Sequence, residues 1–225
     1  MNKKLFFTQI LVLFSGISFA CACTNSENTR VANVIDEKST DIPTKSIILD
    51  YAAQGVADSD NTYLSKEFSE VLRLMGIIPS DNPGGISSYA EIMWNWEDDG
   101  ESDCGESGFF DAEILDIKNN YATGILKYRT CSGSTNKFNV ILINEKVITP
   151  SGKEIEQWVV DDYDGKKKVL LQNLEEAYNL FKNGLGQRLM NDPDESGFMS
   201  DSEKKEYLNS VNIFLNSYNK FKTEK

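Results

Sequence analysis

Residues 191–203 read NDPDESGFMSDSE and gather oxygen-bearing side chains around a single glycine. Counted from Asp192, an acid or a hydroxyl falls at positions 1, 3, 5, 9 and 12, and Gly197 falls at position 6. Calcium takes six to eight oxygen ligands, and this spacing lets a short loop surround one ion while the glycine permits a sharp turn. The stretch therefore predicts a site for a hard cation.

This spacing resembles the EF-hand calcium loop, D-x-[DN]-x-[DN]-G-x₅-E. The resemblance implies that six residues surround one calcium ion. Asp192, Asp194, Ser196 and Glu203 would bind through side-chain oxygens. Phe198 would bind through its backbone carbonyl, and Ser200 through a bridging water. Only three of these residues are acidic and the sequence has no second loop, so we expect weak binding, with a Kd of roughly 10⁻⁴ to 10⁻³ M.

A second interpretation of the same stretch needs no ion. The segment DPDESG can form a plain turn, and Ser200 with Glu203 matches the capping box of a following helix. Both interpretations predict a helical hairpin over residues 169–225, in which Gly184 and Gly186 weaken the first helix. The apolar residues of its two helices recur at spacings of three or four: Leu171, Leu174, Tyr178, Phe181, Leu185 and Leu189, then Tyr207, Val211, Phe214, Tyr218 and Phe221.

The first 23 residues differ from the rest of the chain. Lys3 and Lys4 form a basic start, an apolar run follows, and small residues lie near its end. This pattern is typical of a secretory signal peptide and is too short for a membrane span. Residues 24–43 are polar and are expected to form a flexible tether.

Two cysteines lie at the end of this signal, in the stretch FACAC. The stretch also resembles a bacterial lipoprotein signal, in which a cysteine after small residues is lipidated and becomes the new N-terminus. Cys23 is the predicted lipidation site and Cys21 is the alternative. The choice of Cys23 leaves Cys104 and Cys131 as a pair, whereas the choice of Cys21 leaves an odd cysteine. Contact with the membrane is then expected only through the lipid.

A predicted β-hairpin brings the remaining cysteines close together. Strand-like segments 109–117 and 121–130 are joined through Asn119–Asn120, and asparagine tolerates the positive φ that such a turn needs. A turn centred there pairs residues whose numbers sum to 239. Cys104 and Cys131 sum to 235 and so lie near the open end of the hairpin. We therefore predict a disulfide between them, which an exported location permits.

Two further segments, 137–144 and 155–163, complete a predicted antiparallel meander of four strands. One helix is predicted within 61–75 and a second through 86–96. The first has its apolar face formed by Leu64, Phe68, Val71, Leu72 and Met75. The expected class is α+β, with N-terminal helices packed on a curved antiparallel sheet in a domain of residues 44–168, followed by the C-terminal helix–loop–helix.

Helices before such a sheet, with a last strand reading WVVDDYDG, resemble the cystatin-like or nuclear-transport-factor-like α+β roll over residues 60 to 165. The resemblance implies a concave sheet face that binds small molecules or proteins. It carries over no functional residue.

The charge of the chain bears on its partners. Cleavage ahead of Cys23 removes two lysines and no acidic residue, which leaves 21 basic and 35 acidic residues and a net charge of −14. Such a surface repels nucleic acid and anionic lipid and favours cations or basic partners. Six acids fall in residues 97–106, which we interpret as a solvated loop. The absence of histidine excludes His-based triads and His-ligated zinc.

The sequence thus predicts an exported, non-enzymatic binding or interaction protein of the bacterial envelope, whose partner is an unknown protein or small molecule. Two alternatives stay open. An immunity protein would block a toxin through acidic surface complementarity. A carboxylate-dependent hydrolase would need two carboxylates with raised pKa in a deep pocket. Trp94, Trp96 and Trp158 are candidates to line a ligand face, although packing in the core is the commoner use.

Overall fold

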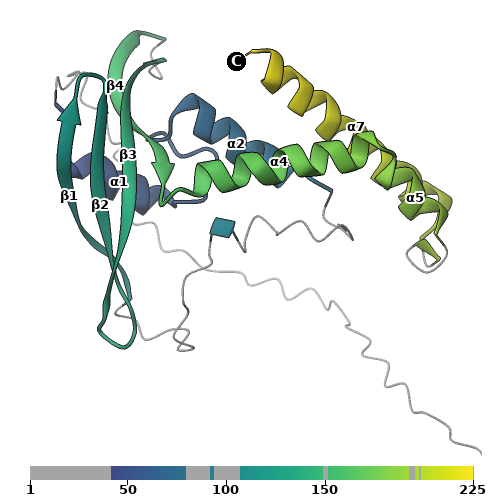
Figure 1. The fold of residues 1–225 in the computed structure, drawn as a ribbon, viewed down its shortest axis with the longest axis horizontal. Coiled ribbons are helices and arrows are strands. Elements are labelled where there is room, and N and C mark those ends of the chain that lie inside the picture. The colour runs from purple at the N-terminus through teal and green to yellow at the C-terminus, as the bar shows by residue number, and fades with distance from the viewer. Residues whose placement is uncertain are drawn as a thin grey trace, which may run out of the picture. The chain divides into compact units, whose positions relative to one another are not determined.

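The computed structural model describes residues 42–79, 92–93, 107–148, 152–192, 196–197 and 199–224. The chain separates into residues 1–37 and 38–225, and every described residue belongs to the second unit. Along the described chain, helices precede a sheet of four strands and further helices follow it, which confirms the predicted α+β class (Figure 1). None of the helices in these ranges is long and apolar enough to cross a membrane.

The sheet is the predicted antiparallel meander. Its strands are β1 (Gly108–Lys118), β2 (Tyr121–Arg129), β3 (Thr135–Ile148) and β4 (Glu154–Tyr163), and they lie side by side in that order. The strands formed where the sequence is rich in β-branched and aromatic residues, because such side chains fit the pleated surface of a sheet. All four predicted segments are confirmed, with β3 extended at both ends.

The first hairpin turns at Asn119, which has the expected positive φ of 52°. Lys118 lies opposite Tyr121, so the paired numbers sum to 239 as predicted. Two bulges, between Phe109 and Asp111 and between Ile114 and Asp116, then shift the register until Gly108 pairs with Arg129 and the sum is 237. The bulges therefore move the open end toward the register that the cysteine pair needs.

One face of the sheet is packed under helix α1 (Lys45–Gln54), which lies behind the strands in Figure 1. This inner face carries alternate residues that are buried in the core: Ala122, Leu126, Val140 and Leu142. On α1, Ile47, Ile48 and Tyr51 are buried against the sheet at helical spacing. The sequence analysis did not predict α1, whose apolar residues begin directly after the tether.

Gly124 of β2 is the point of closest approach between α1 and the sheet. A Cβ atom built there would lie 2.6 Å from Cδ1 of Ile48 and 2.7 Å from the backbone oxygen of Glu113. Real Cβ atoms essentially never show such distances. Glycine is therefore what allows α1 to pack directly on the backbone of β2.

Helix α2 (Lys66–Gly76) confirms the first predicted helix but starts later than expected. Ser65 is its N-cap and accepts a hydrogen bond from the Phe68 N–H at 3.0 Å. Leu64 lies outside the helix and forms a parallel bridge with Val160 of β4. The five residues of the predicted apolar face are all buried. Of the second predicted helix, only residues 92–93 are described, and both are helical and buried.

The C-terminal part consists of α4 (Lys166–Lys182), α5 (Leu185–Asn191) and α7 (Asp201–Thr223). Gly184 has a φ of 84°, so the predicted weak point is a complete break between α4 and α5. Three residues of the predicted stripe, Leu171, Tyr178 and Leu185, are only half-buried. Leu174 and Phe181 of the stripe are buried as predicted, and the buried face of α4 also contains Leu170 and Ala177. The predicted face of α7 is confirmed, since all five of its residues are buried.

Candidate functional site

The loop that the sequence singled out lies between two helices, as both interpretations require. Helix α5 ends at Asn191, directly before position 1 of the loop, and α7 begins at Asp201, at position 10. Of the six predicted ligands, Asp192, Ser196, Ser200 and Glu203 are described. Asp194 and Phe198 lie outside the described residues. The structure therefore shows the helix–loop–helix but only part of the predicted ligand set.

The two serines are already engaged within the hairpin. Ser196 is 1% exposed, and its hydroxyl lies 2.9 Å from the carbonyl oxygen of Met190 and 2.8 Å from that of Asp192. Ser200 is the N-cap of α7 and accepts a hydrogen bond from the Glu203 N–H at 3.3 Å. A serine hydroxyl has one proton but two lone pairs, so both oxygens keep some acceptor capacity.

Glu203 folds back over the loop. Its carboxylate accepts hydrogen bonds from the Ser200 N–H at 2.6 Å and from the Ser200 hydroxyl at 2.7 Å. The hydroxyl bond is the main reason that the pKa of Glu203 is lowered. The capping box is therefore confirmed, while calcium binding stays a prediction. Across the described residues no group of three or more Asp, Glu, Cys or His side chains is placed to hold a metal.

A second polar cluster, which the sequence analysis missed, joins β4 to the starts of α2 and α4. Lys167 is 9% exposed, and its ammonium lies 2.7 Å from a carboxylate oxygen of Asp161 and 2.5 Å from one of Glu67. The Ser65 hydroxyl donates to the same Asp161 oxygen at 2.7 Å. Asp161 is the extra residue where the register of β3 and β4 shifts beside Leu142. We call these four residues the charged junction.

The electrostatics of the charged junction favour a structural role. Burial lowers the pKa of Lys167, but its hydrogen bonds to Asp161 and Glu67 outweigh burial and leave the pKa raised, so the lysine stays protonated. Beside it, burial raises the pKa of Asp162, and the Lys167 N–H, which donates to that carboxylate at 2.9 Å, opposes the rise. The contacts of Lys167 with Asp161 and Glu67 therefore link β4, α2 and α4.

The outer face of the sheet, turned away from α1, carries apolar side chains. In β2 and β3 the neighbours of the buried inner residues point to this side, and they include Tyr121, Ile125, Ile141 and Ile143. Tyr121 is 42% exposed, and the three isoleucines are half-buried without belonging to the core cluster. Tyr121 of β2 faces Ile143 of β3, so that apolar side chains adjoin across these two strands, whereas Val159 of β4, opposite Ile143, is fully buried.

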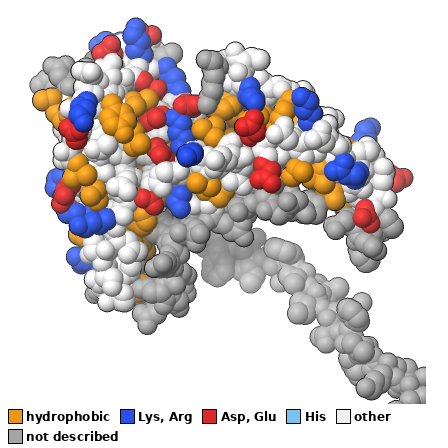
Figure 2. Space-filling model, viewed as in Figure 1, with side chains coloured by type: hydrophobic (Ala, Val, Ile, Leu, Met, Phe, Trp, Pro, Cys, Tyr) orange, Lys and Arg blue, Asp and Glu red, His pale blue; other side chains and the backbone are white. Residues whose placement is uncertain are grey.

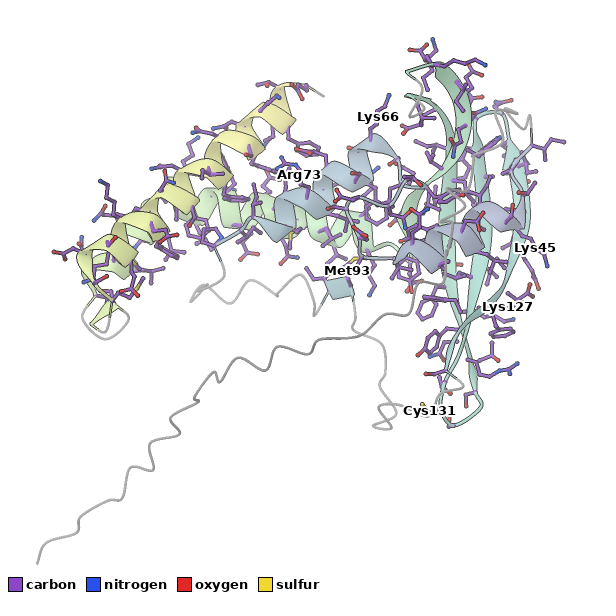
Figure 3. The ribbon with its side chains drawn as sticks, turned by 180° about the vertical axis from the view of Figure 1, so that it is seen from behind. Lys45, Lys66, Arg73, Met93, Lys127 and Cys131 are labelled. Atoms are coloured by element: carbon purple, nitrogen blue, oxygen red, sulfur yellow. The ribbon has the colours of Figure 1, made fainter. Side chains whose placement is uncertain are left out.

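Charges around this outer face are paired with one another. Asp111 lies 3.1 Å from the Lys127 ammonium and 3.3 Å from that of Lys45, which α1 supplies (Figure 3). Lys118 is paired with Asp116 at 2.7 Å. Figure 2 shows hydrophobic side chains gathered on this side of the sheet, with basic and acidic side chains around them. The face therefore combines apolar side chains with several paired charges, although the chain as a whole is strongly acidic.

Other predicted site residues divide between the core and the parts that the structure leaves out. Trp158 is 1% exposed and belongs to the core, so it does not line an open ligand face. Cys131 lies in the turn between β2 and β3 (Figure 3). Cys104 lies outside the described residues, so the disulfide stays a prediction. Also outside the described residues are Cys21, Cys23, Trp94, Trp96 and the acidic segment 97–106.

Comparison with known proteins adds no family to these observations: no protein family, curated protein or solved structure matches the chain. The candidate sites therefore rest on the geometry of the chain itself.

Proposed function

We propose that this is an exported binding protein of the bacterial envelope, held at the membrane by a lipid on Cys23 or, alternatively, Cys21, with one weak calcium site in its C-terminal hairpin. The position of Glu203 carries the calcium part. This residue is at position 12 of the loop and in the first turn of α7, and its carboxylate already faces the loop at Ser200. An ion there would draw both oxygens of Glu203 away from the cap and would offset the mutual repulsion of Asp192, Asp194 and Glu203.

Thermal melting in calcium and in chelator tests this site. Millimolar calcium should raise the melting temperature of the wild type, because an ion that binds only the folded state stabilises it. Glu203→Gln should abolish that rise, since it removes a charged bidentate ligand while keeping the shape. Lys204→Ala is the matched control and should keep the rise. Comparing each variant with and without calcium removes the separate cost of a weakened cap.

If calcium changes the melting of neither the wild type nor Glu203→Gln, the loop is a capped turn and the calcium part is wrong. Calorimetric titration should give a Kd of roughly 10⁻⁴ to 10⁻³ M, the range of extracellular modules.

Mass spectrometry of the mature N-terminus tests the location. The expected species begins at Cys23 and carries acyl chains, with Cys21 as the alternative start. An unmodified mature chain that begins at or beyond Cys23 would refute the lipid anchor and leave a soluble exported protein. Because this measurement does not depend on calcium, it tests the lipid anchor independently of the calcium site.

The outer face of the sheet is the surface that we propose for binding, and its occupant is another protein. Two observations support this. Apolar residues lie side by side on β2 and β3, where an antiparallel sheet usually presents polar residues to water. Several charges around these residues are paired with one another, so a partner can dock there without breaking those pairs. An open sheet face suits a protein surface better than a small molecule, which needs an enclosing pocket.

Site-specific photo-crosslinking in the producing cell tests this surface. A crosslinker at Ile143 should give a discrete adduct with a second protein, and Tyr121→Asp in the same chain should abolish it. A crosslinker at Ile213 of α7, which is 50% exposed, is the matched control on another element. Equal labelling from both positions, or labelling that Tyr121→Asp leaves unchanged, would refute binding by the outer face.

A further inference from the structure

Two buried polar atoms without a hydrogen-bond partner belong to directly paired residues of the sheet. Asn144 of β3 and Trp158 of β4 are directly paired across the two strands. Trp158 is 1% exposed, and its indole nitrogen Nε1 has no hydrogen-bond partner. The side-chain oxygen Oδ1 of Asn144 is also buried and also lacks a partner. The two atoms therefore do not bond to each other, although their residues are neighbours.

The two atoms have opposite hydrogen-bonding roles. The indole N–H of Trp158 can only donate, whereas Oδ1 of Asn144 can only accept. A buried polar atom without a partner carries its full desolvation penalty, so native interiors almost always satisfy such groups. One small molecule that accepts from Trp158 and donates to Asn144 would satisfy both atoms at once.

We propose that a single water molecule binds between Trp158 and Asn144, accepting from Nε1–H and donating to Oδ1. Size argues for water, since directly opposed residues of an antiparallel pair have Cβ atoms only about 4.5–5.5 Å apart. Buried waters characteristically bond to interior polar groups that nothing else satisfies. The molecule would accept one bond and donate another, and its second proton stays available for a further acceptor.

This site also touches the first hairpin. The backbone N–H of Asn144 donates to the carbonyl oxygen of Asn120, in the turn between β1 and β2, at 3.0 Å. Asn144 thus bonds to the β1–β2 turn through its backbone and, through the bound water, to β4. The water would therefore connect the β1–β2 turn, through Asn144, to Trp158 in the core.

Nuclear magnetic resonance on the ¹⁵N-labelled full chain tests the proposal directly. The chain has three tryptophans, and Trp158→Phe identifies which indole signal belongs to Trp158. That indole proton should show a rotating-frame Overhauser effect with water, whose sign separates a bound water from simple proton exchange. The absence of this effect in the wild type would overturn the proposal.

A double-mutant cycle supplies a second readout. Trp158→Phe and Asn144→Leu each leave one polar atom unmet, so each should raise the unfolding constant. The double variant removes both atoms and should raise it less than the product of the two single effects. If the effects simply multiply, the two residues share no bound molecule and the proposal fails. A coupling without the water signal would mean a direct bond between the side chains, which overturns it as well.

Discussion

Replacing Gly124 by alanine is the sharpest test of how α1 packs on the sheet. Gly124 does not have a positive φ, so alanine can adopt its backbone conformation and the effect is purely steric. The new methyl would lie 2.6 Å from Cδ1 of Ile48 and 2.7 Å from the oxygen of Glu113. Ile48 is fully buried, and Glu113 belongs to the β1–β2 ladder opposite Ile125, so neither neighbour can yield cheaply.

The expected cost follows from two opposing terms. Overpacking a buried site costs about 1–3 kcal/mol. A glycine-to-alanine change returns about 0.4–1 kcal/mol, because it restricts the unfolded chain. A net loss of about 1–2 kcal/mol remains, which for a chain of this size lowers the Tm by about 2–8 °C.

Differential scanning calorimetry of three variants decides the point. Gly76→Ala is the matched control, since a Cβ there meets nothing within 4 Å, and it should melt at or slightly above the wild type. Adding Ile48→Val to Gly124→Ala removes the atom nearest to the new methyl, so the two changes together should cost less than their sum. If Gly124→Ala melts like the wild type, or if the two changes are additive, α1 does not pack on β2 as described.

Three further predictions concern the charged groups. Lys167→Met should destabilise by about 1–3 kcal/mol in urea unfolding, because it strands partly buried carboxylates, whereas Lys45→Met, which breaks an exposed pair, should cost about 0–1 kcal/mol. Because the pKa of Asp162 is raised in the folded state, this residue stabilises the fold below its unfolded pKa, and that stabilisation is lost as pH rises through its folded pKa. Asp162→Asn should therefore be neutral or stabilising at pH 7, and it should flatten the pH dependence of the Tm in acid. The lowered pKa of Glu203 has the opposite sign, so amide protection in the first turn of α7 should be lost as pH falls through its folded pKa, and Ser200→Ala should remove that dependence.

The sheet could be predicted because its pattern is local. Each strand is a short run rich in β-branched and aromatic residues, and a pair of asparagines marks the first turn, so the pairing of Lys118 with Tyr121 follows from the sequence. Helix α1 could not be predicted in the same way. Its N-cap residue, Thr44, makes no side-chain capping bond, and its burial depends on a glycine in β2 far along the chain. The helical spacing of Ile47, Ile48 and Tyr51 covers little more than one turn, and it does not show that these residues pack on β2.

The candidate sites show a similar division. Ser200 and Glu203 are visible in the sequence, but they serve a capping box and a calcium loop equally well, so their spacing cannot separate the two. The charged junction was missed because a bulge in β4 places Asp161, and alternation does not reveal bulges. In α4 the predicted stripe began with Leu171, half-buried, whereas the buried residue is Leu170. When the packing partners of a helix are unknown, its sequence shows the spacing of the apolar residues more reliably than it shows which of them are buried.

The two bulges of β1 affect more than the register of the first hairpin. β1 is the last strand on its side of the sheet, and none of the described strands pairs with its other edge. A strand beginning GFFDAEI at such an edge is a template on which further chains can add. Bulges at two places within eleven residues kink the strand and interrupt the even spacing of its backbone groups. An incoming strand can match only the short stretch between them, so the bulges oppose edge-to-edge addition of another chain at β1.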